Sequence, residues 1–234
     1  MEKQVSNRKK GAVSKQNEAS SIVVIGLGRF GTSLALELLR GGREVLGIDA
    51  DARTVQNLSD ELSDVVQADS TDETALRELG IQDFDSAVVA IGSDLEASIL
   101  TASLLLQLGV PQVWAKATST AHGRILNQLG VHHVIFPEMD MGKRVAHMVS
   151  GESLDYVPID DDFVMVKTSA PELFNGKTLA EMRFRSEHGV TVVATKKAGA
   201  AYLPSFPETV IETGDEIIVA GRTEKVDLFC KLGL

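Results

Sequence analysis

Three glycines near the start of the chain place the strongest constraint on its fold. The stretch "VVIGLGRFG" at residues 23–31 sets an apolar run directly before Gly26, Gly28 and Gly31, with the spacing G-x-G-x-x-G. In a dinucleotide-binding turn, the first glycine permits the tight turn and the second lets the backbone approach a pyrophosphate. The third lets the following helix pack against its strand, and the N-terminus of that helix faces the anion. The spacing therefore predicts a nucleotide-binding turn, with glycines kept only for packing as the alternative.

A carboxylate downstream supports nucleotide binding. Asp49 ends the run "VLGID", 18 residues after Gly31. At about this distance, an acidic residue hydrogen-bonds the ribose hydroxyls of the nucleotide and disfavours a 2′-phosphate. We therefore predict that Asp49 is the ribose ligand.

Short β-branched runs alternate with longer helical patterns from residue 21 to about residue 150, as in a parallel sheet covered on both faces. Six strands with five intervening helices would make a complete Rossmann-type unit. The expected strands lie at residues 22–25, 44–48, 64–67, 87–91, 112–115 and 133–136. We expect Ser70, Ser93 and Thr118 to cap three of the helices.

The pattern changes in the last third of the chain. An acidic, loop-like stretch with "IDDD" at 159–162 follows a helical pattern at 139–150, and short strands separated by turns begin at Phe163. Brief helices are expected at 178–185 and 223–232. We therefore expect an α/β fold, a Rossmann-type parallel sheet followed by a small α+β C-terminal domain. Its parts are a disordered basic tail at 1–20, a Rossmann domain at 21–151 that includes the crossover helix 139–150, and the C-terminal domain at 152–234.

The crossover helix has an apolar face that this chain alone would leave exposed. Met141, Val145, Met148 and Val149 follow helical spacing. Burial against a neighbouring molecule would remove this face from water, so we expect the helix to cross to a partner subunit.

Composition narrows the function classes and the compartment. The 234 residues have a formal net charge of −10, which disfavours broad nucleic-acid binding because phosphate neutralisation requires a basic face. Cys230 is the only cysteine, so no intrachain disulfide can form, and no apolar signal segment follows the first methionine. The apolar run at 97–110 is too short to cross a bilayer. We therefore expect a cytosolic protein.

Two charged residues follow expected strands. Lys116 in "VWAKA" ends the fifth strand, where its ammonium could reach a phosphate; a solvated lysine is the alternative. Glu138 in "IFPEMDMG" follows the sixth strand. A carboxylate beside phosphates is repulsive unless a cation lies between them, so Glu138 is a candidate ligand for a hard cation such as Mg²⁺, Ca²⁺ or Na⁺. Asp140 is expected to cap the next helix instead.

Nucleotide binding leaves several functions open. A small NAD-dependent dehydrogenase also needs an acid–base group, and His188 is the only histidine in residues 152–234. A Rossmann-fold redox-sensing regulator of transcription needs a basic DNA-reading helix, and the only basic stretch is the N-terminal tail. The other histidines lack zinc-site spacing, and we expect each to be exposed or half-buried: His122, His132, His133 and His147.

The motifs, taken in order, resemble a known family. "VVIGLGRFG", "VLGIDAD", "VVAIGSDLEASI", "VWAKA" and "PEMDMG" are similar to the regulator-of-K⁺-conductance (RCK) domains of cytosolic potassium-transport subunits of the KtrA type. The resemblance extends from residue 21 to about residue 234. The chain has one copy of the two-part TrkA-N and TrkA-C unit, whereas TrkA proteins carry two.

The resemblance implies a non-enzymatic regulator without nucleic-acid partners. Homodimers would assemble into an octameric ring beneath a membrane K⁺-conducting subunit of the KtrB or TrkH type, at the inner face of the plasma membrane. ATP would favour the active state and ADP the inactive one, with NAD(H) able to occupy the same site.

The resemblance also assigns residues. Gly26, Gly28, Arg29, Phe30 and Gly31 match the phosphate-binding turn. Asp49 matches the ribose ligand, Asp69 and Ser70 match the edge of the adenine pocket, and Ile91 and Gly92 belong to the nucleotide-binding "VVAIGSD" motif. Lys116 matches a phosphate-contacting lysine, and Glu138 a glutamate that holds a cation near the γ-phosphate.

Arg29 is long and charged at a place where many redox enzymes keep a smaller residue. We expect its guanidinium to point toward the nucleotide of a dimer mate and to distinguish ATP from ADP by a charge-assisted hydrogen bond.

The C-terminal domain departs from some relatives. In those relatives it binds cyclic di-AMP, and Arg185 matches an arginine used there. The polar "RFRSEHG" and the shifted prolines of "LPSFPE" differ from that pattern, so we do not predict cyclic di-AMP binding.

Overall fold

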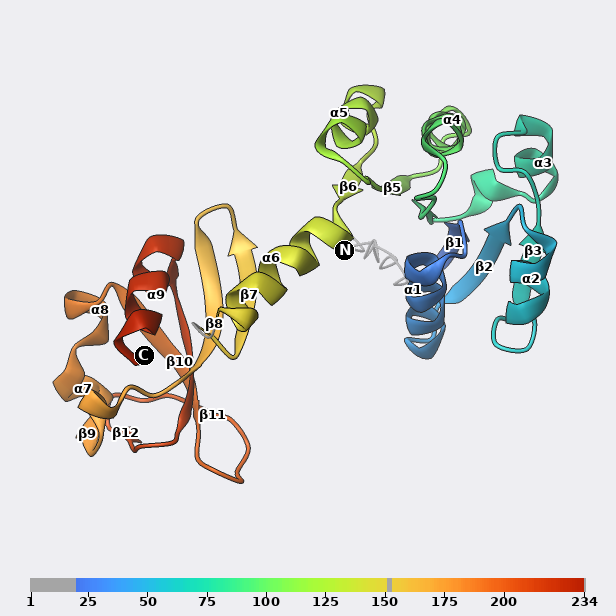
Figure 1. Cartoon of the computed structure of the whole chain (residues 1–234). Helices are drawn as coiled ribbons and strands as arrows, with labels where there is room; N and C mark the ends of the chain where they lie inside the picture. The colour runs from blue at the N-terminus through green and yellow to red at the C-terminus, as the bar shows by residue number, and fades with distance from the viewer. Residues whose placement is uncertain (1–19, 151–152, 234) are drawn as a thin grey trace, which may run out of the picture. The chain divides into compact units, whose positions relative to one another are not determined.

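The computed structural model describes residues 20–150 and 153–233. Contacts divide the chain after Pro137 into two compact units, each with its own hydrophobic core. Almost all of the expected basic tail, residues 1–19, lies outside the described residues. Figure 1 shows the elements of each unit.

The first unit is a six-stranded parallel sheet in the order β3-β2-β1-β4-β5-β6. Its strands are β1 (Ser21–Ile25), β2 (Glu44–Asp49), β3 (Asp64–Gln67), β4 (Ser86–Val89), β5 (Gln112–Lys116) and β6 (His133–Ile135). The connecting helices are α1 (Arg29–Arg40), α2 (Ala52–Leu58), α3 (Glu73–Glu78), α4 (Leu95–Gln107) and α5 (Thr120–Leu129), with a short 3₁₀ turn η1 (Ile81–Asp83). This arrangement confirms the predicted Rossmann-type sheet. The strand order reverses between β1 and β4, where open parallel sheets bind their ligands.

The strands at the centre of this sheet are buried on both faces. Val23 and Val24 are neighbours in β1 and point to opposite faces, yet both are 0% exposed. Val23 belongs to one apolar cluster and Val24 to another. A continuous apolar run is therefore the expected sequence for such a strand.

The predicted helix caps were wrong at three helices. Asp72 caps α3, Asp94 caps α4 and Ser119 caps α5, each side chain accepting a backbone N–H of its first turn. An aspartate caps as well as a serine, and the residue directly before the first turn has the right reach. Ser70, Ser93 and Thr118 all lie one or two residues too early in the chain.

The second unit is built on an antiparallel sheet in the order β11-β10-β13-β8-β7, with a separate β12-β9 pair. Its strands are β7 (Asp155–Asp160), β8 (Phe163–Ser169), β9 (Lys177–Thr178), β10 (Val190–Lys196), β11 (Leu203–Pro204), β12 (Val210–Ile211) and β13 (Glu216–Arg222). Its helices are α6 (Pro137–Val149), which begins at the boundary, α7 (Leu179–Met182), α8 (Phe184–Glu187) and α9 (Thr223–Cys230), with 3₁₀ turns η2 (Glu172–Phe174) and η3 (Lys231–Gly233). The predicted small α+β domain is confirmed.

Two local expectations in this unit were wrong. The "IDDD" stretch is not a loop throughout, because β7 continues to Asp160, which pairs with Phe163 across a tight turn. The helix expected at 178–185 is two short helices. Arg183 separates them with a left-handed φ of 47°, which a continuous right-handed helix does not allow.

Helix α6 has the predicted apolar exposure. Met141 is 52% exposed, Val145 44% and Met148 42%, and no residue of this helix is buried. An ion pair fixes the helix to β7, since the Arg144 guanidinium donates two 2.8 Å hydrogen bonds to Asp155. Contacts group α6 with the second unit, whereas the sequence assigned it to the first domain. The boundary at residue 151 and the crossing to a partner stay predictions.

Candidate functional site

The turn between β1 and α1 requires glycine at two positions. Gly26 has a φ of +92°, and a Cβ there would lie 2.9 Å from the backbone nitrogen of Ile91. A Cβ on Gly31 would overlap the carbonyl oxygen of Gly26. The N–H of Gly26 donates to the Ile48 carbonyl over 2.8 Å and ties the turn to the end of β2. The first and third glycines thus serve the tight turn and the close helix packing that the motif predicted.

Gly28 differs from the other two, because a Cβ there would meet no atom within 4 Å. It is the N-cap residue of α1, and no side chain caps the helix. The first turn of α1 has no acidic residue. The first N–H groups of a helix lack intrahelical partners and favour an anion. The open side of Gly28 would therefore leave room for a phosphate to approach the backbone.

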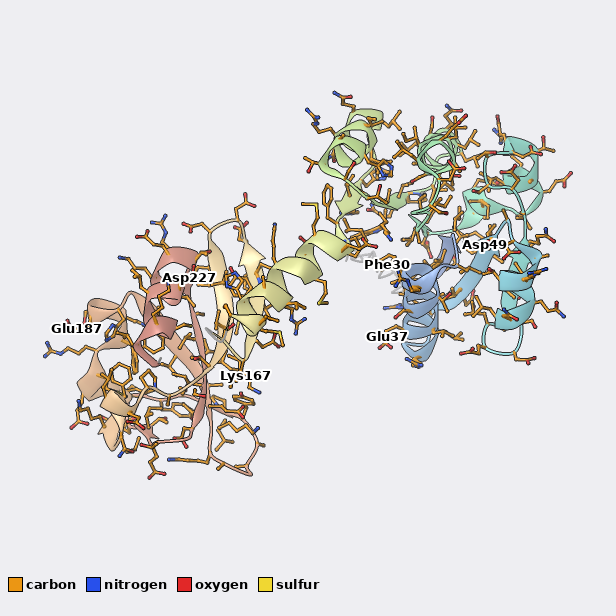
Figure 2. The ribbon with its side chains drawn as sticks, viewed as in Figure 1. Phe30, Glu37, Asp49, Lys167, Glu187 and Asp227 are labelled. Carbon is orange, nitrogen blue, oxygen red and sulfur yellow. The ribbon has the colours of Figure 1, made fainter. Side chains whose placement is uncertain are left out.

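Asp49 connects β2 to this turn. One of its carboxylate oxygens accepts the Leu27 N–H over 2.7 Å, and the other accepts the Asp51 N–H over 2.9 Å. Each carboxylate oxygen can accept more than one hydrogen bond. Asp49 therefore fixes the turn and keeps capacity for ribose hydroxyls. Asp49 and Phe30 are labelled on the first unit in Figure 2.

The two residues predicted at the adenine edge point in different directions. Asp69 is exposed, and the Thr71 hydroxyl and N–H bond its carboxylate and hold its pKa below the usual value. Ser70 is only 7% exposed, and its hydroxyl lies 2.7 Å from that of Thr101 in α4. The backbone of this segment is tied to β2, since the Ala68 N–H donates to the Asp49 carbonyl. Only Asp69 presents its side chain at the surface.

Lys116 is a buried lysine at the carboxyl end of β5. It is 9% exposed, so the alternative of a solvated strand-end lysine was wrong. Its Nζ lies 3.1 Å from the position that a Cβ on Gly92 would take and 5.7 Å from the centre of the Phe30 ring. Because Gly26 packs against Ile91, these contacts bring the ends of β1, β4 and β5 together. Lys116, Gly92, Ile91 and Phe30 therefore surround the glycine turn.

Glu138 lies in a different setting. It belongs to the first turn of α6 and groups with the second unit. Asp140, the expected cap, lies inside that turn because α6 begins at Pro137. Within residues 20–150 and 153–233, no group of three or more histidine, cysteine, aspartate or glutamate side chains could hold a metal ion. These residues do not form a metal site by themselves, so Glu138 as a cation ligand stays a prediction.

Arg29 is exposed and lines an open groove along α1. The groove runs from the turn toward the other end of the helix and also contacts Arg40. Its remaining lining residues are Leu27, Gly28, Thr32, Ser33 and Leu36. Arg29 therefore lies at the surface beside the phosphate turn, where a second molecule can reach it.

Sequence reasoning missed one residue near this site. His122 in α5 was expected to be exposed or half-buried, but it is 1% exposed. Burial lowers the pKa of its imidazole. Its Nδ1 accepts the Thr118 N–H over 3.3 Å. The only sequence signal was its place in the first turn after the fifth strand.

A second hollow lies in the C-terminal unit. It is lined by residues of α7, α8, β10 and the segment after β11, including Arg183, Arg185, Thr191 and Phe206. The Arg185 Nε donates to the Thr191 hydroxyl over 3.1 Å. This arginine therefore has an internal hydrogen-bond partner beside the hollow.

Within the described ranges, no helix combines the length and the apolarity that a membrane span requires.

The fold defines a class: a Rossmann-type domain followed by a small antiparallel α+β domain. Family models match both parts, a TrkA-N domain at residues 22–137 and a TrkA-C domain at 164–232. The chain is 37% identical to the Ktr system potassium uptake protein C of Bacillus subtilis over 89% of this chain and 95% of that protein. It is 35% identical to the Ktr system potassium uptake protein A of Vibrio alginolyticus over 87% of this chain and 93% of that protein. The chain belongs to the KtrA-type family of proteins with TrkA-N and TrkA-C domains, which confirms the resemblance.

Solved structures agree on the fold. The RCK domain of GsuK matches with a TM-score of 0.55 and 25% identity over 94% of this chain and 47% of that one. A GsuK channel bound to NAD matches with a TM-score of 0.66 and 17% identity over 94% of this chain and 40% of that one. The chain spans less than half the length of these GsuK chains.

Proposed function

We propose that this protein is a cytoplasmic, nucleotide-responsive regulator of a K⁺ uptake system. The observation that carries the proposal is the cluster at the carboxyl ends of β1, β2, β4 and β5. An uncapped helix N-terminus, an open glycine and a buried lysine there suit phosphates, while Asp49 suits a ribose. The names of the Ktr relatives supply the link to potassium uptake.

Adenine nucleotides are the ligands we assign to this site. ATP and ADP differ by one phosphoryl group, so a site with Lys116 inside and Arg29 beside it can give them different affinities. NAD(H) shares the adenosine diphosphate part, and a GsuK channel with this fold was solved bound to NAD. A hard cation held by Glu138 and phosphate oxygens is part of the same proposal, without a step assigned to it.

The proposed assembly is a homodimer that forms an octameric ring. The exposed apolar face of α6 supports association, because a monomer would leave it in water. The ring would dock at the inner face of the plasma membrane, on a membrane K⁺-conducting subunit of the KtrB or TrkH type. Nucleotide exchange would change the geometry of the ring. Membership in the KtrA-type family favours this regulatory role over a dehydrogenase or a DNA-binding regulator.

Titration calorimetry of the full chain with ATP, ADP and NADH tests the proposal. Lys116→Met keeps the buried aliphatic stem and removes the ammonium. A hydrogen bond to a charged group contributes about 1.5–3 kcal/mol, so ADP affinity should fall by roughly tenfold to a hundredfold. Lys231→Met, at an exposed lysine of the second unit, is the control. Wild-type protein that binds none of the three nucleotides would refute the proposal.

A further inference from the structure

The segment that links β5 to α5 forms one wall of the proposed nucleotide site. Only residues 117–119 separate the two elements. A Cβ added to Gly92 would lie 3.1 Å from the Lys116 Nζ and 3.7 Å from the methyl carbon of Thr118. Lys116 and Thr118 therefore border the same glycine from one side. A shift of this short segment would therefore change the surroundings of the Lys116 ammonium beside Gly92.

His122 holds this segment from within the protein. It lies in the first turn of α5, where its own N–H donates to the hydroxyl of the cap residue Ser119. Its Nδ1 accepts the Thr118 N–H over 3.3 Å and lies 3.4 Å from the Thr118 hydroxyl. Because Nδ1 accepts a hydrogen bond, the proton of the neutral imidazole is on Nε2. The imidazole thus holds Thr118 through the backbone N–H of that residue.

The same imidazole is a poor choice for stability alone. Its Nε2 is buried and has no hydrogen-bond partner among the described residues. A buried donor without a partner destabilises the folded state, and an apolar side chain of similar size would avoid this cost. Most buried polar atoms are paired, so an exception calls for an explanation. The hydrogen bond that Nδ1 accepts from the Thr118 N–H provides this explanation.

We propose that His122 is a positioning residue for nucleotide binding. It acts through the Thr118 backbone and sets the orientation of Lys116 toward the nucleotide phosphates. The inference rests on the proposed function and adds a residue to the same site. His122 itself does not touch the ligand.

Two substitutions separate positioning from packing. His122→Leu fills the space without an acceptor, while His122→Asn places an amide oxygen close to the position of Nδ1. We expect the Leu variant to bind ADP about tenfold more weakly. This is the lower end of the loss in affinity seen at metal sites when a residue that orients a ligand is removed. The Asn variant should recover most of this loss. Without nucleotide, the Leu variant should melt close to the wild-type temperature, since it no longer buries the unpaired Nε2.

His133→Leu, at the exposed histidine of β6, controls for the loss of an imidazole and should bind ADP like the wild type. Wild-type ADP affinity in His122→Leu would overturn the inference. A Leu variant whose weaker binding comes with a lower melting temperature and no rescue in the Asn variant would assign His122 a packing role and would also overturn it.

Nitrogen NMR of the ligand-free wild-type protein tests the geometry without a variant. The result expected is an imidazole protonated on Nε2, and protonation on Nδ1 would contradict the arrangement. A wild-type chain that binds none of ATP, ADP and NADH would instead refute the proposed function. The two failures are therefore distinguishable.

Discussion

The carboxylate of Asp49 accepts the backbone N–H of Leu27 over 2.7 Å, so the end of β2 holds the glycine turn after β1 in place. The same side chain was predicted as the ribose ligand from its distance along the sequence. One carboxylate thus holds the folded turn, and we propose that it also accepts the ribose hydroxyls of the nucleotide.

Removing that carboxylate should weaken nucleotide binding. Asp49→Ala loses both the anchor of the turn and the ribose acceptor, and we expect ADP affinity to fall by at least about tenfold. Asp49→Asn keeps one acceptor oxygen and should be intermediate. Asp51→Ala is the control, because Asp51 caps α2 and should cost about 1 kcal/mol of stability without affecting the site. Calorimetry and thermal melting measure both effects, and equal ADP affinity in Asp49→Ala and the wild type would contradict the assignment.

The glycine turn offers a matched pair of substitutions. Gly31→Ala forces a Cβ onto the Gly26 carbonyl, so the ligand-free protein should melt at a lower temperature. Gly28→Ala meets no protein atom at a φ of −68°, but alanine is a poorer N-cap residue than glycine, so the melting temperature should fall by much less than in Gly31→Ala.

Gly28→Ala should affect nucleotide affinity much more than it affects stability. Its added methyl would occupy the open side where we expect the phosphates, and ADP binding should be lost from a protein that is still stable. Unimpaired ADP binding by Gly28→Ala would show that the phosphates do not approach the backbone there.

Arg29 should distinguish the two nucleotides. If its guanidinium contacts the terminal phosphoryl of ATP in a dimer mate, Arg29→Ala should weaken ATP binding about tenfold and leave ADP affinity unchanged. Arg40→Ala, at the other end of the same groove, should change neither. Parallel titrations with ATP and ADP decide this, and an equal loss for both nucleotides would defeat the assignment.

A salt-bridge network in the second unit predicts acid sensitivity. Glu216 accepts from Lys167 over 2.9 Å and from the Tyr202 hydroxyl over 2.7 Å. These partners, Lys167 first, lower the pKa of Glu216 from 4.5 to about 2. As the pH falls, Glu216 is therefore protonated in the unfolded chain before it is protonated in the folded protein. The stabilising contribution is complete above pH 4.5 and is lost as the pH falls toward 2.

Glu216→Gln tests this network. The wild-type protein should melt at a higher temperature than the variant at pH 7, and the difference should shrink as the pH falls below about 4.5. Glu208→Gln, at an exposed glutamate between β11 and β12, is the control. A constant difference across this range would mean that Glu216 keeps an ordinary pKa in the folded protein.

Local patterns predicted the sheet and the glycine turn because both depend on residues close in sequence. Gly26 and Gly31 have packing roles that spacing alone can indicate, whereas the hydrogen bond from Leu27 to Asp49 was not predicted. Ser70 was different, since its hydroxyl bonds Thr101 in another helix and no local pattern reveals that contact. His122 was missed for the same reason, because its burial depends on how α5 packs. The caps failed by one or two residues where several polar side chains compete for one helix start.

A crystal structure of the full chain with ADP would show directly whether the glycine turn binds the phosphates. We expect phosphate oxygens within hydrogen-bond distance of the backbone N–H groups at the start of α1, the ribose hydroxyls on Asp49, and the Lys116 ammonium on a phosphate. ADP bound elsewhere on the molecule, with the open side of Gly28 facing only solvent, would contradict this expectation.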